Sequence, residues 1–348
     1  MSARKLTRQQ QWRIDKVQEE RNARALRKDE RLDATPQEGL APESQQGLVT
    51  AHFGRQVEIE AIDGVLQGQR QRCHVRANVE NLVTGDYVSW RPNQNPLEEG
   101  VVESRQARRS LLARPDMRGV MKPVAANVDQ LLLVIAPEPE PHANLIDRYL
   151  VAAEHTGIAP VLVFNKWDLM QQGVLTAAQE ALVSGLFNTY QQLGYQVLIS
   201  SAYQENDLQE QLQQQLKDKI SVFVGQSGVG KSSLINCLLP GVDLRVGSLS
   251  EDTRKGRHTT TTARLFHFPI GGQLIDSPGI REFSLGYLQP EEIAQGFIEF
   301  RPFLGLCRFR DCKHQADPSC ALKEAVAEGK IAETRFASYH HLVNSLNS

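Results

Sequence analysis

Hydrophobic and polar positions alternate differently in the two main parts of this 348-residue chain. From Gly47 to about Leu112 short alternating runs are separated by glycines and prolines, which predicts a small β-domain. From Val128 onwards continuous apolar runs alternate with helical stretches, which is typical of parallel strands buried on both faces. The pattern therefore predicts a β-domain followed by an α/β domain. The strands expected in the second part are 130–135, 161–164, 197–199, 221–225, 263–268 and 273–275.

The first part holds five expected strands. Five short strands in one small domain suit a closed barrel, and the oligonucleotide-binding (OB) barrel is the leading interpretation. An RNA-binding role is favoured because four arginines gather at the end of this part, and a structural barrel without a ligand is the alternative. The expected strands are 48–53, 57–62, 73–79, 86–90 and 100–102, and the arginines are Arg105, Arg108, Arg109 and Arg114.

The N-terminal residues 1–44 differ from both parts because they have few large apolar side chains. Within residues 1–31 ten Lys and Arg face five Asp and Glu. Such a segment cannot build a core, so we expect a disordered arm that either contacts nucleic acid or is simply solvated. No membrane span is expected, since the longest apolar run, Leu131–Ala136, is too short. No secretory signal is expected either, because an apolar stretch is missing from the N-terminus.

A phosphate-binding motif carries the clearest chemistry. Residues 225–232 match G-x-x-x-x-G-K-[ST] between an expected strand and an expected helix. The glycines let backbone N–H groups turn toward phosphate oxygens at the helix N-terminus, Lys231 reaches the terminal phosphates, and Ser232 places its hydroxyl on Mg²⁺. A glycine-rich turn is the alternative. The predicted nucleotide-binding residues here are Gly225, Gln226, Ser227, Gly228, Val229, Gly230, Lys231, Ser232 and Ser233.

A guanine-reading motif, N-K-x-D, follows the expected strand 161–164. Its last residue, Asp168, can accept hydrogen bonds from both donors on one edge of guanine, a charge-assisted pair that adenine cannot make. Asn165 is expected to support the base and the loop, and the Lys166 stem to lie against the base. A Ser-Ser-Ala turn after the next strand fits the loop whose backbone N–H meets the guanine carbonyl. The predicted residues are Asn165, Lys166, Trp167, Asp168, Ser200, Ser201 and Ala202.

Two switch motifs follow the phosphate loop. In the polar stretch 256–262, Thr259 and Thr260 are the candidates for a second hydroxyl on Mg²⁺. The D-x-x-G motif then offers Asp276 to hold Mg²⁺ through water and the Gly279 N–H to sense the γ-phosphate. GTPases ordinarily place the phosphate loop first and N-K-x-D fourth. Here N-K-x-D comes first, so the order predicts a circular permutation, which an α/β sheet tolerates.

A metal-binding pattern, C-x4-C-x-H-x5-C, lies near the C-terminus. Three thiolates and one imidazole make a complete tetrahedral set, which favours a structural zinc ion and leaves no open position for catalysis. Free buried cysteines are the alternative. The predicted ligands are Cys307, Cys312, His314 and Cys320.

The motif order, the loop at 225–233, the stretch 256–261 and the cysteine–histidine pattern closely resemble the ribosome small-subunit-dependent GTPase A family over about residues 45–348. The resemblance implies a circularly permuted α/β P-loop GTPase core with an N-terminal OB-fold β-barrel and a C-terminal α-helical zinc-binding domain. The implied organisation is an arm at 1–44, an RNA-binding barrel at 45–112, the GTPase domain at 113–285 and the zinc-binding domain at 286–348.

The same resemblance implies a cytoplasmic factor that binds the small (30S) ribosomal subunit and its 16S rRNA. It implies that the subunit stimulates hydrolysis of GTP to GDP during late subunit maturation. One structural Zn²⁺, and Mg²⁺ bound with GTP, are the expected cofactors. A monomer that binds neither membranes nor DNA is expected. Two other classes of function stay open: a metal-delivery GTPase, and an RNA-binding scaffold with an inactive nucleotide domain.

One catalytic group is missing from the motifs. Ras-like GTPases orient the attacking water with a glutamine after D-x-x-G, and here that position is Ile280, which can neither donate nor accept a hydrogen bond. We expect slow intrinsic hydrolysis that speeds up on the ribosome. His258, beside the switch threonines, is the candidate catalytic residue, and a contact with solvent or RNA is its alternative role.

Overall fold

The computed structural model describes residues 39–41, 43–54, 56–79, 81–115, 120–201, 207–240, 263–276, 285, 287–315 and 317–347. These residues form two compact units, one ending at Ala107 and the other comprising Val83–Gly85 and the chain from Arg108 onwards. Most of the predicted arm 1–44 lies outside the described residues. None of the helices in the described ranges is long and apolar enough to cross a membrane.

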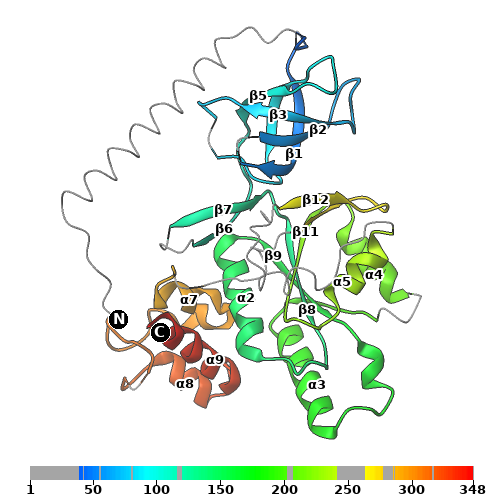
Figure 1. The fold of residues 1–348 in the computed structure, drawn as a ribbon. Coiled ribbons are helices and arrows are strands. Elements are labelled where there is room, and N and C mark those ends of the chain that lie inside the picture. The colour runs from blue at the N-terminus through cyan, green and yellow to red at the C-terminus, as the bar shows by residue number, and fades with distance from the viewer. Residues whose placement is uncertain are drawn as a thin grey trace, which may run out of the picture. The chain divides into compact units, whose positions relative to one another are not determined.

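The first unit is a five-stranded closed barrel (Figure 1). Each strand hydrogen-bonds to two others, in the ring order β1-β2-β3-β5-β4, and only the β3–β5 pair is parallel. Gly47 in β1 leaves room for the barrel core, since a Cβ there would lie 2.3 Å from Ile59 and 2.7 Å from the Trp90 indole nitrogen. The predicted closed barrel is confirmed. Its strands are β1 (Gln45–Phe53), β2 (Gln56–Ala61), β3 (Arg70–Val75), β4 (Tyr87–Arg91) and β5 (Gly100–Arg105).

The second unit is built on a six-stranded sheet of order β10-β9-β8-β11-β13-β12. All neighbours are parallel except β13 and β12. Every residue of β8 and β11 is buried, as their mostly apolar runs predict, and the two polar residues, Gln130 and Ser221, hydrogen-bond to each other. The strands are β8 (Gln130–Ile135), β9 (Ala159–Phe164), β10 (Gln196–Ile199), β11 (Ile220–Val224), β12 (Arg264–His267) and β13 (Gln273–Asp276).

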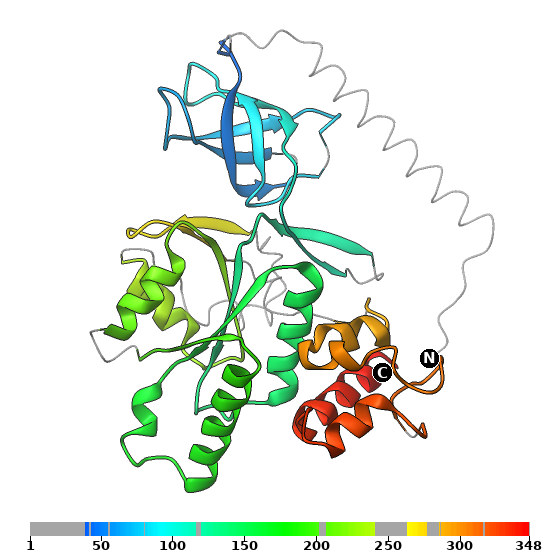
Figure 2. The same cartoon turned by 180° about the vertical axis from the view of Figure 1, so that it is seen from behind.

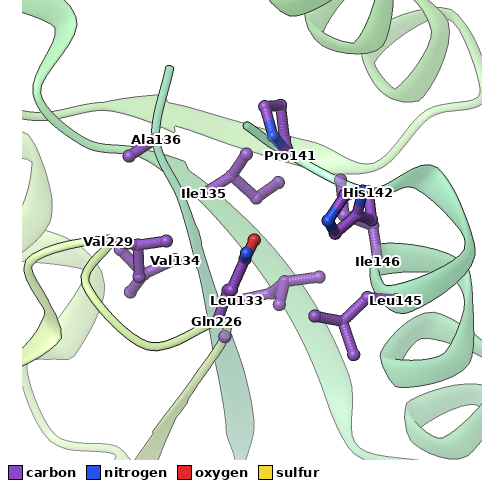
Figure 3. A pocket seen from close by; sticks show the side chains of 11 residues that line it. Leu133, Val134, Ile135, Ala136, Pro141, His142, Leu145, Ile146, Gln226 and Val229 are labelled. Carbon is purple, nitrogen blue, oxygen red and sulfur yellow. The ribbon is translucent and has the colours of Figure 1, made fainter. Parts of the chain in front are cut away.

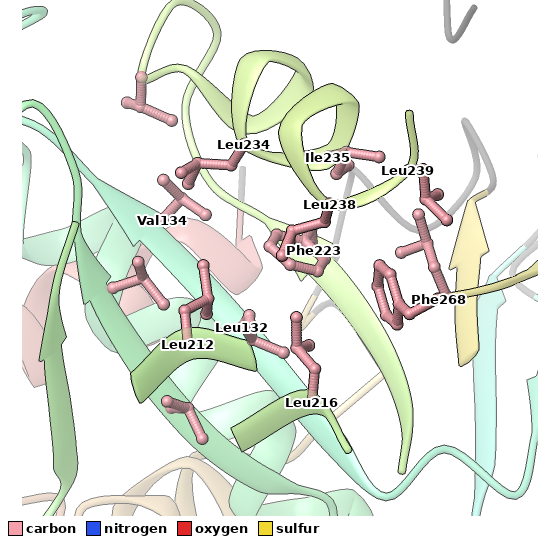
Figure 4. Close-up of a cluster of buried hydrophobic side chains, with 14 of the residues drawn as sticks. Leu132, Val134, Leu212, Leu216, Phe223, Leu234, Ile235, Leu238, Leu239 and Phe268 are labelled. Carbon is pink, nitrogen blue, oxygen red and sulfur yellow. The ribbon is translucent and has the colours of Figure 1, made fainter. Parts of the chain in front are cut away.

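Helices cover both faces of this sheet, and the period of two along β8 shows why. Leu132 and Val134 pack against α4 (Asp207–Leu216) and α5 (Lys231–Leu238), in the apolar cluster of Figure 4. Leu133 and Ile135 point to the opposite face, where they line a pocket with residues of α2 (Ala143–Thr156). The helix α3 (Ala177–Gln192) and the 3₁₀ helix η1 (Trp167–Met170) complete this part.

A two-stranded ribbon that the sequence pattern did not predict precedes the sheet. Its strands, β6 (Leu111–Pro115) and β7 (Met121–Ala126), pair antiparallel. They carry mixed polar and apolar residues without a buried run, so neither periodicity signalled them.

The C-terminal residues form a small helical region beside α2 (Figures 1 and 2). Its apolar cluster includes Val151 and Ala152 of α2, and Gly296 approaches so closely that a Cβ would lie 2.7 Å from Val151. The α2 helix is therefore shared between the sheet and the C-terminal region. The elements of this region are α7 (Pro290–Gly296), η4 (Ile298–Phe303), α8 (Ala321–Ala327), α9 (Glu333–Asn344) and η5 (Ser345–Asn347).

Candidate functional site

The phosphate loop runs from the end of β11 at Val224 to the start of α5 at Lys231. Its glycines have positive φ angles of 133° at Gly225, 85° at Gly228 and 93° at Gly230. At Gly225 a Cβ would lie 2.2 Å from the Val134 carbonyl oxygen, so only glycine lets the loop pass β8 this closely. The sequence motif therefore folds as the strand–loop–helix unit that presents backbone N–H groups to phosphate.

The side chain of Lys231, the motif lysine, folds back over the phosphate loop. Its Nζ donates to the carbonyl oxygens of Gly225, at 2.8 Å, and of Gln226, at 2.6 Å. These bonds hold the ammonium group above the backbone that would surround the phosphates. Ser232 is the next residue of α5, so its hydroxyl lies at the helix N-terminus beside the loop.

The N-K-x-D residues connect the end of β9 to the phosphate loop. Asn165 is buried and donates from Nδ2 to the Val229 carbonyl oxygen at 2.9 Å. Lys166 has a left-handed backbone with φ 56°, and its Nζ donates to the Gly228 carbonyl oxygen at 2.8 Å. A non-glycine residue in this conformation is uncommon and concentrates at functional sites. The base motif and the phosphate loop thus form one hydrogen-bonded assembly.

Two hydrogen bonds fix the Asp168 carboxylate beside the end of β10. Its Oδ1 accepts from the Ser201 hydroxyl at 2.6 Å and its Oδ2 from Gln172 Nε2 at 3.3 Å. The Trp167 backbone N–H donates to the Ser200 carbonyl oxygen at 3.2 Å, which ties the two predicted guanine loops together. Five predicted residues lie outside the described ranges: Ala202, His258, Thr259, Thr260 and Gly279.

Asp276, the first residue of the D-x-x-G motif, is the last residue of β13. The β13 strand is the parallel neighbour of β11, so Asp276 and the phosphate loop lie at the same carboxyl edge of the sheet. This edge is where open α/β sheets bind ligands. Asp276 and Ser232 could hold Mg²⁺ there, since carboxylate and hydroxyl oxygens are ligands that this ion prefers.

The loop between β8 and α2 belongs to the site, although no motif pointed to it. The Glu138 carbonyl oxygen accepts from Lys166 Nζ at 2.8 Å, and the Pro139 ring faces Gly228. Between this loop and the phosphate loop lies a cavity of about 20 Å³, room for one water molecule (Figure 3). A signal was present in the sequence: the proline-rich run 137–141 begins two residues after the end of a fully buried parallel strand.

The three cysteines and the histidine of the C-terminal pattern come together, with ligand atoms within 4.8 Å of one another. His314 Nδ1 lies 3.5, 3.6 and 3.4 Å from the sulfurs of Cys307, Cys312 and Cys320. A tetrahedral ion with Zn–S of about 2.3 Å and Zn–N of about 2.0–2.1 Å requires a sulfur–nitrogen distance of about 3.6 Å. The residues therefore fit a tetrahedral metal ion.

The electrostatics of this cluster agree with that fit. Burial lowers the pKa of His314, which favours the neutral imidazole that a metal needs. Burial, followed by hydrogen bonds to Cys307 and Cys320, raises the pKa of Cys312 to about 12. Crowded thiols are costly to ionise without a cation among them, so the cluster is suited to hold one.

The fold and these motifs define a class: a circularly permuted P-loop GTPase, with the guanine motif before the phosphate loop in the chain. The RsgA GTPase family matches residues 105–286, which is more than half of the chain. The chain belongs to this family, and the GTPase activity predicted from its motifs is that of the family.

Relatives match over nearly the whole length. The "Small ribosomal subunit biogenesis GTPase RsgA" of Azotobacter vinelandii is 60% identical over 99% of this chain and 98% of its own. The protein of the same name from Ectopseudomonas mendocina is 58% identical over the same shares. Among solved structures, YjeQ from Thermotoga maritima has a TM-score of 0.70 and 33% identity, covering 88% of this chain and 99% of its own. YloQ, described as a circularly permuted GTPase, has a TM-score of 0.68 and 26% identity, covering 90% of this chain and 98% of its own.

Proposed function

We propose that this protein hydrolyses GTP to GDP at the phosphate loop during late maturation of the small (30S) ribosomal subunit, and that the subunit stimulates the reaction. The observation that carries the proposal is the single hydrogen-bonded assembly of Lys231, Lys166, Asn165 and Asp168 at one edge of the sheet. Full-length relatives named as small ribosomal subunit biogenesis GTPases support the ribosomal role.

At the nucleotide, each residue of the assembly takes one role. The N–H groups of the loop 225–233 surround the phosphates, and Lys231 exchanges its carbonyl bonds for terminal phosphate oxygens. Asp168 accepts from the guanine edge, with Ser201 holding the carboxylate in place. The Ser200–Ala202 turn meets the guanine carbonyl, and the Asn165 amide joins the base motif to the phosphate loop.

Magnesium bound with GTP supplies the charge neutralisation that phosphoryl transfer requires. Ser232, Asp276 and one of Thr259 and Thr260 would hold it, and the Gly279 N–H would sense the γ-phosphate. The catalytic role of His258 is part of the proposal because Ile280 cannot orient water. The test is His258→Ala: loss of subunit-stimulated turnover with unchanged GTP affinity supports it, and unchanged stimulation removes it.

The surface proposed for 16S rRNA includes the β6–β7 ribbon. The barrel segment 45–107 carries six Lys and Arg against eight Asp and Glu, whereas 108–126 carries five against one. Across the ribbon, Arg114 and Lys122 are directly opposed partners. Two cationic side chains in neighbouring positions offer an RNA phosphate a paired positive charge. The barrel unit, taken by itself, carries a cation–aromatic pair of the kind that contacts nucleic-acid bases, because the Arg72 guanidinium lies 4.8 Å from the Phe53 ring centre.

The metal at Cys307, Cys312, His314 and Cys320 is proposed to be one structural zinc ion. All four tetrahedral positions have protein ligands, so no position is left for a substrate. This closed set argues against a metal-delivery GTPase. We further propose that the protein is a cytoplasmic monomer that binds neither DNA nor membranes, because the ribosomal subunit is its target.

GTP turnover of the full chain, with and without purified small subunits, tests the main proposal. Turnover that rises several-fold with subunits is the expected result. Zero turnover under both conditions would favour the scaffold with an inactive nucleotide domain, and metal release coupled to hydrolysis would favour metal delivery. Arg114→Glu should reduce the stimulation while basal turnover stays intact, and Arg114→Lys, which keeps the charge, is its matched control.

A further inference from the structure

A buried cluster of charged residues joins α2 and α3 to the C-terminal helices. Asp147 of α2 is fully buried, and Arg335 of α9 is 2% exposed. Arg335 donates to Asp147 Oδ1, and to both carboxylate oxygens of Glu299 at 2.6 and 3.0 Å. Tyr190 of α3 donates its hydroxyl to the same Asp147 oxygen at 2.6 Å. The guanidinium also lies 4.5 Å from the centre of the Phe297 ring.

Packing of α2 against the C-terminal helices does not require such a cluster. The apolar contacts of Val151, Ala152 and Gly296 already join α2 to the C-terminal region. Burying ions is costly, and well-packed apolar side chains in their place are often as stable or more stable. Although burial alone would lower it, the two carboxylates raise the pKa of Arg335, so its charge persists. What the cluster provides is a fixed geometry: the Arg335 guanidinium of α9 binds both carboxylate oxygens of Glu299 in η4 and one of Asp147 in α2, which sets the position of α2 against α9.

The same end of α2 supports the phosphate loop. Asp147 is in the second turn of the helix, and its neighbour Ile146 lines the cavity against Gln226 of the phosphate loop (Figure 3). In the loop that leads into α2, the Glu138 carbonyl oxygen shares Lys166 Nζ with the Gly228 carbonyl oxygen. A shift of the first two turns of α2 would therefore move the contacts on which the phosphate loop rests.

We propose that Arg335, with Asp147 and Glu299, is a positioning cluster that holds α2, and through it the phosphate loop, in the arrangement that binds guanine nucleotide. The inference rests on the nucleotide site proposed above. It makes the C-terminal region a determinant of nucleotide affinity without any contact with the nucleotide. Because α9 also carries Tyr339, which contacts His314, the metal cluster belongs to the same connected structure. Coupling is reciprocal, so nucleotide binding must in turn stabilise the docking of α9 on α2.

The chain offers a matched control at the other end of the same helix. Arg301 donates to Glu154 at 2.7 Å, and this ion pair also joins the C-terminal region to α2. It is more exposed than the Arg335 cluster. Glu154 follows Asp147 by seven residues, about 10 Å along the helix away from the phosphate loop. A change here loosens the same interface without disturbing the first turns of α2.

The experiment measures the Kd of a fluorescent GDP analogue for the full chain, at a temperature where circular dichroism shows each variant folded. Arg335→Met should raise Kd at least tenfold and Arg301→Met less than twofold. In subunit-stimulated turnover, Arg335→Met should raise KM more than it lowers kcat, as expected for lost uniform binding. If Arg335→Met does not fold, Asp147→Asn, which keeps the side-chain shape, decides the question by the same Kd comparison.

Wild-type affinity in a folded Arg335→Met or Asp147→Asn variant would overturn the positioning role, and so would equal losses in Arg335→Met and Arg301→Met. Lys231→Ala, measured alongside, separates this outcome from failure of the proposed site. If Lys231→Ala keeps wild-type affinity, the site itself is wrong. If Lys231→Ala loses binding while Arg335→Met keeps it, only the positioning role is wrong.

Discussion

Gly225, the first glycine of the phosphate loop, offers a sharp test of the geometry around the nucleotide site. Its φ of 133° lies in a region that residues with side chains rarely adopt. A Cβ would also lie 2.2 Å from the Val134 carbonyl oxygen. That carbonyl belongs to β8, which pairs with β11 up to Val224, so neither strand can yield without breaking the ladder between them. Gly225→Ala therefore combines backbone strain with a collision that cannot relax.

The expected cost follows from these two terms. Holding alanine at such a φ costs about 1–3 kcal/mol. Overpacking a fixed core contact adds about 1–3 kcal/mol. Gly157→Ala is the matched control, because Gly157 has φ 69° at the C-cap of α2 and nothing within 4 Å of its Cβ position. Only the left-handed penalty of about 1–2 kcal/mol applies there.

The assay is thermal unfolding followed by circular dichroism, together with the Kd for GDP. An excess destabilisation of about 2 kcal/mol lowers Tm by roughly 4–8 °C in a unit of this size. We expect Gly225→Ala to show this extra loss and to bind GDP at least tenfold more weakly than Gly157→Ala. Equal Tm and equal affinity in the two variants would refute the close approach of the loop to β8.

Three further predictions concern the proposed ligands. Lys231→Ala should abolish GTP turnover while the circular dichroism spectrum stays native, since the Lys231 ammonium group bonds to carbonyl oxygens of the phosphate loop itself; normal turnover would contradict the site. Asp168→Asn should cost about 1.5–3 kcal/mol of GTP affinity, because a charged hydrogen bond to guanine is lost, and should shift the preference toward xanthosine triphosphate. If competition binding shows an unchanged preference, the base is recognised elsewhere. Elemental analysis should find one zinc ion per chain, and Cys312→Ser should lose it together with helical signal; a full zinc content in that variant would exclude Cys312 as a ligand.

Much of the fold could be predicted from the sequence because the pattern and the chemistry agree locally. The strands β8 and β11 are apolar at every position except Gln130 and Ser221, and only a strand buried on both faces needs so continuous a run. The glycines at 225, 228 and 230 mark positive φ angles that other residues avoid. Cys307 to Cys320 have the composition of a tetrahedral ligand set before any distance is known.

Other features could not be predicted because the sequence alone carries little or no signal for them. The β6–β7 ribbon has no regular alternation, so nothing in its sequence separates it from a loop. The role of Glu138 is carried by its backbone carbonyl, which every residue possesses. The buried charged cluster joins residues that are far apart in sequence, and nothing in their identity or spacing indicates that they meet. Its members are Asp147, Tyr190, Glu299 and Arg335.

The sequence by itself determined the class of chemistry: a guanine nucleotide, a phosphate loop, a metal set and the permuted order of the motifs. These depend on which residue types occur at which spacing, and spacing within one loop or turn is preserved in the folded chain. Only the tertiary structure decided how the parts support one another. It showed Lys166 bridging two loops and Arg335 setting α2 against α9. Such contacts depend on how separate helices and strands pack, and packing is a property of the whole fold.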